Sequence, residues 1–182
     1  MHEVIIFSGL AGVGTTTLSK DVARMLGRER FTAGPYFRNK GAELGIALED
    51  TLKFPREFHR EVDEIMYGHM MSGQKVVIEG WFQGVNAFLR KVESDRIYVA
   101  CLDKTRFSRI APRDNVTKNQ ARKINLEREA QNMQMFDEIY GVNDFTDPKY
   151  YTLRLCSERM NQKELAIHTL ARLGLLDQIV AE

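Results

Sequence analysis

Residues 4–7 of this chain are all apolar, and a glycine-rich stretch follows shortly after them. A short apolar run bounded by turn residues is typical of a strand that is buried on both faces. Similar runs recur along the chain and predict five strands, at residues 4–7, 30–32, 75–79, 96–102 and 150–156.

Between these runs the apolar residues are spaced three and four apart, as on one face of a helix. Leu18 and Val22 belong to one such stripe, and Gly27 ends it. Pro55 interrupts another pattern, because proline cannot donate the helical hydrogen bond, and Pro112 separates two charged helical segments. The predicted helices cover residues 18–26, 36–44, 48–71 with its break, 85–92, 104–110, 118–139 and 162–173.

Strands that alternate with helices indicate parallel crossover units with helices on both faces of the sheet. The expected fold class is therefore α/β, a three-layer αβα arrangement in one domain of 182 residues. Ligands of such sheets bind at the carboxyl ends of the strands. Gly9, Thr32, Glu79 and Asp103 each follow a predicted strand, so they should converge on one cleft.

The composition favours neither a nucleic acid nor a membrane as a partner. The net charge is +1, with 43% apolar and 28% charged residues, which is ordinary for a globular domain. No apolar run approaches the roughly 20 residues that span a bilayer, and we expect no signal peptide. Cys101 and Cys156 are expected to be buried free thiols. These features together predict a cytoplasmic protein.

Residues 9–17, Gly-Leu-Ala-Gly-Val-Gly-Thr-Thr-Thr, carry the clearest chemical signal. Their glycines let backbone N–H groups converge on phosphate oxygens, and the following helix directs the positive end of its dipole at the same anion. The layout matches the P-loop G-x-x-x-x-G-K-[ST], with Thr16 at the position whose hydroxyl reaches Mg²⁺ and Thr17 as the substitute if the register shifts by one. We therefore expect a nucleoside triphosphate to bind here, the alternative being only a tight connection. A dinucleotide fingerprint would need glycine or alanine at Thr17.

Thr15 stands where the P-loop pattern has lysine. Losing one positioned donor at a charged transition state typically costs about 2.7–4 kcal/mol, roughly 10²–10³ in rate. Such a loss is tolerable if other cations close over the phosphates. The sequence therefore leaves open whether phosphoryl transfer persists.

Charged residues elsewhere suit the same chemistry. Glu79 ends a buried strand, where a carboxylate can hold Mg²⁺ through water or orient a substrate. Residues 104–128 are strongly basic, which suggests a lid whose arginines clamp phosphates, because the guanidinium fork binds phosphate oxygens in pairs. Arg38 lies one helical turn past Thr32-Ala33-Gly34 and can take the phosphate of an acceptor. Each feature has a structural alternative. Glu79 would then be an exposed acid at the start of a loop, residues 104–128 a solvated helix face, and Arg38 a surface arginine.

Four segments together resemble the nucleoside monophosphate kinases with a P-loop, and most closely the short archaeal-type cytidylate kinases. They are residues 9–17, Thr-Ala-Gly-Pro-Tyr-Phe-Arg at 32–38, Val-Ile-Glu-Gly at 77–80, and the Arg-Glu to Tyr-Gly stretch at 128–141. The P-loop alone is not specific to this family, whereas the second and fourth segments are more so. The likeness covers most of the chain in order and spacing.

The resemblance implies a P-loop NTPase fold with a central parallel five-stranded sheet, a helical monophosphate-binding arm at about 35–71 and a lid at about 105–130. It implies ATP, Mg²⁺ and CMP or dCMP as ligands. We expect a monomer, with a homodimer as the alternative. The ATP phosphates and the metal would be held by Gly9, Gly12, Val13, Gly14, Thr15, Thr16 and Thr17, with Thr16 on the metal. The acceptor would meet Thr32, Gly34, Arg38, Asp63, Glu79, Gly80 and Trp81. Arg109 and Arg113 of the lid, and Arg128, would be the catalytic cations.

Three positions depart from the family by lacking a cation: Thr15, Trp81 and Met135. Neutralising phosphate charge is most of what such an enzyme does. Two alternatives therefore stand beside a cytidylate-kinase-like activity. One is a nucleotide-binding regulatory protein with impaired catalysis, and the other is a P-loop kinase of a different small phosphorylated metabolite.

Overall fold

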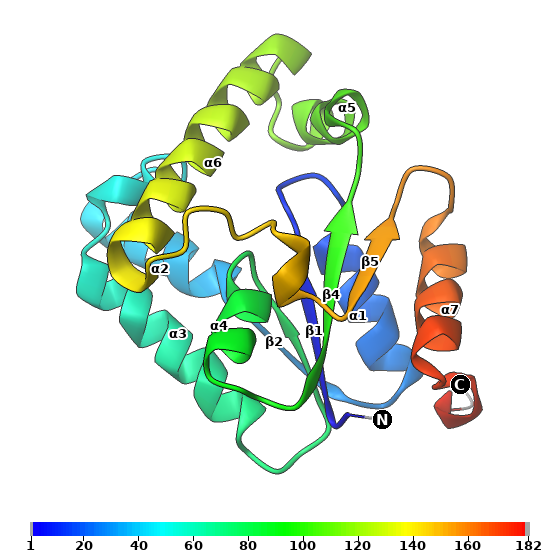
Figure 1. Cartoon of the computed structure of the whole chain (residues 1–182). Coiled ribbons are helices and arrows are strands. Elements are labelled where there is room, and N and C mark those ends of the chain that lie inside the picture. The colour runs from blue at the N-terminus through cyan, green and yellow to red at the C-terminus, as the bar shows by residue number, and fades with distance from the viewer. Residues whose placement is uncertain (1, 181–182) are drawn as a thin grey trace.

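The computed structural model describes residues 2–180 and consists of one parallel sheet between two layers of helices (Figure 1). The strands are β1 (Val4–Ser8), β2 (Glu29–Thr32), β3 (Val76–Glu79), β4 (Ser94–Ala100) and β5 (Leu153–Cys156). They lie in the order β2-β3-β1-β4-β5, and every neighbouring pair is parallel. The predicted five-stranded α/β fold is thus confirmed.

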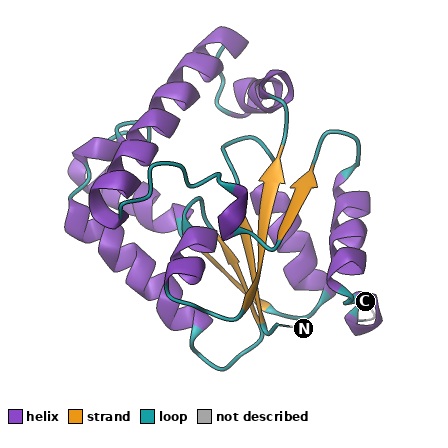
Figure 2. Ribbon diagram, in the orientation of Figure 1, coloured by secondary structure: helices purple, strands orange, loops and turns teal. Residues whose placement is uncertain are grey.

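Helices connect successive strands and cover both faces of the sheet (Figure 2). They are α1 (Thr15–Met25), α2 (Gly34–Leu44), α3 (Arg56–Met70), α4 (Gln83–Leu89), α5 (Asp103–Arg113), α6 (Lys118–Tyr140) and α7 (Gln162–Leu173). Short 3-10 turns occupy Thr51–Lys53, Pro148–Tyr150 and Leu176–Gln178. No helix within residues 2–180 is both long and apolar enough to cross a membrane.

The central strand β1 explains the two-sided core. Ile5 and Phe7 point to one face, where they join a cluster with residues of α1 and α7. Val4 and Ile6 point to the other face, into a cluster with residues of α3 and α4. Because alternate residues of a strand face opposite sides of the sheet, a fully apolar strand needs a helical layer on each side.

A third, aromatic cluster joins the end of α6 to the body of the molecule. Phe82 stacks on Phe136 and on Tyr140 of α6, at 4.3 and 4.6 Å between ring centroids. Phe145, which is fully buried, meets Phe136 edge to face at 5.4 Å. Pairs of this geometry add stability beyond their buried area, so this end of α6 is firmly anchored.

The structure corrects some predicted boundaries. Pro112 lies inside α5 and not between two helices, at the last turn, where only one helical hydrogen bond is lost. The last strand begins at Leu153, because Asp147 and Pro148 start a 3-10 turn that sends Tyr150 into the aromatic cluster. The segment before Pro55 is a 3-10 turn instead of an α-helix. Both cysteines are free, but Cys156 is exposed and Cys101 is half-buried.

Candidate active site

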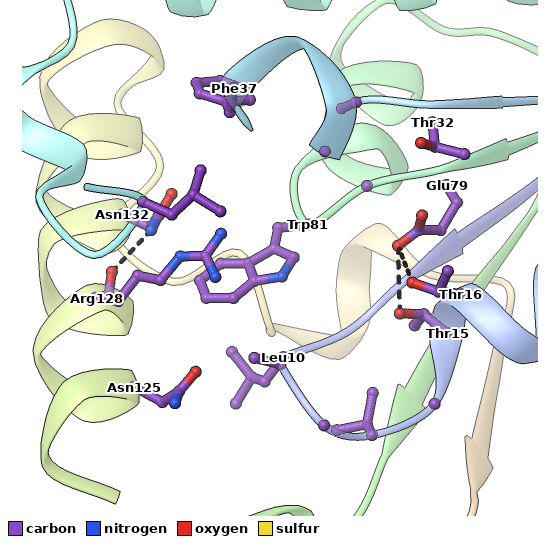
Figure 3. Close-up of a pocket in the computed structure, with 18 of the residues that line it drawn as sticks. Leu10, Thr15, Thr16, Thr32, Phe37, Glu79, Trp81, Asn125, Arg128 and Asn132 are labelled. Carbon is purple, nitrogen blue, oxygen red and sulfur yellow. Dashed lines mark hydrogen bonds between the residues drawn. The ribbon is translucent and has the colours of Figure 1, made fainter. Parts of the chain in front are cut away.

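A cavity of about 1190 Å³ opens at the carboxyl edge of the sheet. Its walls come from the loop after β1, the ends of β2 and β3, the helices of the predicted arm, and α5 and α6 (Figure 3). A single small-molecule site usually measures about 300–1,000 Å³, so this cavity has room for two ligands. The predicted site residues that line it are Gly12, Val13, Gly14, Thr15, Thr16, Thr17, Thr32, Gly34, Arg38, Asp63, Glu79, Gly80, Trp81, Arg109, Arg113 and Arg128.

The loop between β1 and α1 has the geometry of an anion cradle. Gly12 and Gly14 have φ of 81° and 100°, a backbone region that side-chain-bearing residues rarely adopt. A Cβ atom at Gly14 would meet no atom of residues 2–180 within 4 Å, so this part of the loop faces open space. The N-cap residue of α1 is Gly14, which has no side chain that could cap the amino end of the helix. The N–H groups of its first turn have no partner within the helix and are available to an anion.

Gly9 does not line the cavity. A Cβ atom there would lie 2.6 Å from the carbonyl oxygen of Val99 and 2.8 Å from Cγ2 of Val13. Gly9 is therefore needed where the loop passes close to β4. The family resemblance implied that Gly9 contacts the ATP phosphates, but the structure places this glycine against β4 and outside the cavity lining.

Two side chains at the wall of the cavity hold the loop in place. Ser157 donates a hydrogen bond from Oγ to the carbonyl of Val13 at 2.6 Å. Arg109 donates to the same carbonyl at 3.4 Å and to the Ser157 carbonyl at 3.0 Å. Arg109 thus couples α5 to the loop after β1, so a displacement of α5 would act directly on the loop.

Four polar side chains meet at the position where P-loops carry lysine. Glu79 Oε1 accepts hydrogen bonds from the hydroxyls of Thr15 and Thr16, both at 3.4 Å. Glu79 Oε2 lies 3.3 Å from the guanidinium of Arg30, a residue of β2. Burial raises the pKa of Glu79, whereas the charge of Arg30, the two hydroxyls and the charge of Arg38 oppose that rise.

The same group fits a magnesium ion bound together with phosphates. The Thr16 hydroxyl and the Glu79 carboxylate are hard oxygen donors that face each other across one space. Mg²⁺ usually takes one or two protein oxygens and completes its shell with phosphate oxygens and water. Within residues 2–180 no group of three histidine, cysteine or acidic side chains could bind a metal by itself. The protein donors therefore suit a metal that arrives with a nucleotide.

Arg38, Arg113 and Arg128 also line the cavity. Burial lowers the pKa of Arg128, and the positive charges of Arg113 and Arg38 lower it further. Arg38 lies back over Gly34, where a Cβ atom would be 3.3 Å from its Nη1. Arg113 pairs with the neighbouring Asp114 at 2.7 Å. Such a cluster of guanidinium groups favours an anion.

Asp63 lines the cavity but is fully engaged within the protein. Gln83 and Tyr140 each donate a hydrogen bond of 2.6 Å to its carboxylate, one to each oxygen. Burial raises the pKa of Asp63 to about 6 despite these two donors. The Asp63 carboxylate thus joins α3, α4 and α6, and both of its oxygens are engaged by side chains of the protein.

The sequence reasoning missed two residues of the site, Arg30 and Ser157. Arg30 precedes Thr32 by two residues in a strand, and alternate strand residues share a face. Because Thr32 was already a candidate, this alternation could have indicated Arg30 as a second candidate on the same face. Ser157 follows the last strand by one residue, but nothing in the local pattern marks it, since its partner Val13 is 144 positions away.

The comparisons with known proteins agree with this geometry. The AAA domain family model matches residues 5–134. Cytidylate kinase from Pyrococcus horikoshii is 32% identical over 97% of this chain and 91% of its own length. Cytidylate kinase from Pyrococcus furiosus is 35% identical over 82% and 77%. Shikimate kinase from Bacteroides thetaiotaomicron shares the fold with a TM-score of 0.61 at 14% identity, covering 94% of this chain and 98% of its own.

The cytidylate kinase relatives, together with the fold and the cavity, define an ATP-dependent phosphotransferase of the P-loop class, in which the glycine-rich loop after β1 and several arginines line one cavity. Within that class, the two Pyrococcus relatives, each more than 30% identical to this chain, are both cytidylate kinases. The chain belongs to the cytidylate kinase family, in the group that the AAA domain model matches.

Proposed function

We propose that this protein transfers the γ-phosphoryl group of ATP to CMP or dCMP with Mg²⁺ present. The observation that carries the proposal is that one cavity is lined both by the glycine-rich loop after β1 and by Arg38, Arg113 and Arg128. Its volume of about 1190 Å³ has room for a donor and an acceptor together. The names of the cytidylate kinase relatives supply the acceptor.

The donor would lie against the loop and α1. The N–H groups around Gly14 and Thr15 would bind the phosphate oxygens, and Thr16 and Glu79 would hold the metal. Bound Mg²⁺ would supply neutralisation of phosphate charge. Arg30 keeps an opposite charge beside Glu79, which favours the ionised carboxylate that a metal needs.

The acceptor phosphate would lie among Arg38, Arg113 and Arg128. An oxygen of that phosphate attacks the γ-phosphorus, the bond from the γ-phosphorus to the β–γ bridging oxygen breaks, and ADP leaves with the bridging oxygen. A phosphate oxygen is already an adequate nucleophile, so no strong base is required. Catalysis then consists of positioning and of spreading positive charge around the transferred group.

The predicted arm at 35–71 and lid at 105–130 belong to this proposal. Both contribute walls to the cavity, through residues such as Phe37 and Arg113. Closing them over two nucleotides would exclude water and complete the positive charge around the transferred group. A cytoplasmic location and a monomeric state go with the proposal.

A coupled assay of ADP formation tests the proposal directly. CMP and dCMP should be the best acceptors, ahead of UMP and AMP, and activity should require Mg²⁺. Arg128→Met should lower turnover, while Arg154→Met, an arginine of β5 outside the cavity, should not. ADP formation that does not rise above background with any of the four acceptors would contradict the proposal.

A nucleotide-binding protein without turnover is the second candidate, and the neutral residues Thr15 and Trp81 favour it. It predicts heat of binding with Mg-ATP or CMP in calorimetry but no ADP formation. Met135, the third neutral position, does not support this candidate as strongly, since its side chain is 2% exposed and does not line the cavity. A thermal-shift screen over phosphorylated metabolites tests the further alternative of another acceptor.

A further inference from the structure

Trp81 and Arg128 form a contact that the proposed reaction does not yet explain. The Arg128 guanidinium carbon lies 4.7 Å from the centroid of the Trp81 ring, within the range of a cation–π interaction. The indole lies between Arg128 on α6 and the group of Glu79, Thr15 and Thr16 (Figure 3). It therefore sits at the boundary between the donor and the acceptor parts of the cavity.

The two partners differ in how firmly they are held. Trp81 follows β3 by two residues, its neighbour Gly80 donates a backbone hydrogen bond to Phe7, and Phe145 stacks on the indole at 6.0 Å. Arg128 is a long side chain, and within residues 2–180 no group accepts a hydrogen bond from its buried Nε. The ring is thus the fixed partner, and it holds the guanidinium in one place.

Arg128 is buried among charges of both signs. Burial acts most strongly against its charged form and Arg113 and Arg38 add to that effect, while Glu49 and Glu129 favour the charge. A desolvated cation in such surroundings needs an attractive contact that keeps it in place. The negative face of the indole ring supplies that attraction without occupying the N–H groups of the guanidinium, which stay available for an anion.

We propose that Trp81 is a positioning residue that holds Arg128 ready for the phosphate of the acceptor. This inference rests on the proposed function and adds the device that keeps its acceptor site formed before the substrate binds. Ordering a long side chain in the free protein lowers the entropic cost of binding. Trp81 thereby acts on the acceptor phosphate through Arg128 and does not stack on the base.

Kinetics with a matched pair of variants tests this role. Trp81→Phe keeps an aromatic face, and Trp81→Leu keeps apolar bulk without one. Trp81→Leu should raise the KM for CMP about 2- to 30-fold, the range of a cation–π contact, and leave the KM for ATP within about twofold. Trp81→Phe should restore most of the difference. Equal effects of both variants, or equal effects on both substrates, would mean that Trp81 only fills space.

A double-mutant cycle separates action through Arg128 from direct contact with the base. In the Arg128→Met background, Trp81→Leu should cause no further rise in the KM for CMP, because the residue through which it acts is gone. A full additional rise in that background would overturn the proposal in favour of base stacking.

Fluorescence tests the same point without turnover. Trp81 is the only tryptophan of the chain, so tryptophan emission reports on this ring alone, and Trp81→Phe gives the blank. CMP should change the emission and cytidine should not, and Arg128→Met should abolish the CMP response. An equal response to cytidine would overturn the positioning role. If no monophosphate is turned over but these fluorescence responses are found, the proposed phosphoryl transfer is wrong and the positioning role of Trp81 stands. If CMP is turned over normally and Trp81→Leu leaves the KM for CMP unchanged, the proposed transfer stands and the positioning role is wrong.

Discussion

The guanidinium of Arg30 lies 3.3 Å from Glu79 Oε2, while the other oxygen of the same carboxylate faces Thr15 and Thr16. Arg30 also donates from Nε to the Ser19 hydroxyl at 2.8 Å, which fixes its position against α1. The chain thus carries a cation near the place where a P-loop lysine would lie. It comes from the neighbouring strand and reaches the site through Glu79.

Replacing Arg30 by methionine should impair both the site and the fold. The half-buried carboxylate of Glu79 would lose its cationic partner, and a charge-assisted hydrogen bond is worth about 1.5–3 kcal/mol. We expect kcat/KM for phosphoryl transfer to fall roughly 10- to 100-fold, with a higher Mg²⁺ requirement, and Arg30→Lys to recover part of it. In the Glu79→Gln background the same change should have little effect, which steady-state kinetics can measure. Arg154→Met serves as the control.

Restoring lysine at position 15 should compensate for the loss of Arg30. Thr15 Oγ1 is 3.4 Å from Glu79 Oε1, so an ammonium built from this position can reach both the carboxylate and the bound phosphates. Calorimetry with Mg-ATP should show a larger gain in affinity for Thr15→Lys in the Arg30→Met protein than in the wild type. Thr15→Met is the uncharged control. Equal gains in both backgrounds would show that Arg30 and a lysine at position 15 act independently.

The two helices of the predicted lid, α5 and α6, are joined by a buried ion pair. Arg106 of α5 contacts Glu129 of α6 through two hydrogen bonds of 2.5 and 3.0 Å, and the two side chains are only 2% and 9% exposed. Glu129→Gln leaves the buried guanidinium with only the exposed carboxylate of Asp103, 2.8 Å from its Nε, as a charge partner. We therefore expect up to about 3–5 kcal/mol of destabilisation in urea unfolding. Replacing both residues by methionine should cost much less than that. The exposed pair of Lys40 and Glu43 is the control, at about 0–1 kcal/mol.

Asp63 should make the protein less stable as the pH rises from about 4 to 6. Its pKa is about 6 in the folded protein and near 3.8 when unfolded, so the folded state binds the extra proton in that window. The loss of stability amounts to about 3 kcal/mol, because each pKa unit is worth roughly 1.4 kcal/mol. The free energy of unfolding of Asp63→Asn, measured relative to wild type, should therefore be up to that amount higher at pH 7.5 than at pH 4. Urea unfolding at both pH values measures it. Asp147→Asn, at an exposed carboxylate whose pKa is lowered, should not follow this pattern.

Local patterns were sufficient for most of the architecture. The apolar run at 4–7 predicted a two-sided buried strand, and the glycines at 12 and 14 predicted a turn with positive φ. Both depend on interactions within a few residues, which is why they could be read from the chain. The last strand was predicted to begin too early, at residue 150, because Tyr150 and Tyr151 are residue types that favour strands. Their packing against Phe88 and Tyr98 is a long-range contact.

The sequence by itself determined the order of the strands and helices, the phosphate-binding turn and the chain's likeness to its family, because each of these follows from neighbouring residues or from spacing along the chain. Only the tertiary structure decided that Arg30 faces Glu79, that Arg128 rests on Trp81 and that Gly9 packs against β4 instead of facing the cavity. Each of these contacts joins residues 47 or more positions apart or depends on which strands are neighbours. A charge or a ring acquires its role from what surrounds it in space, and that surrounding is set by the folded sheet.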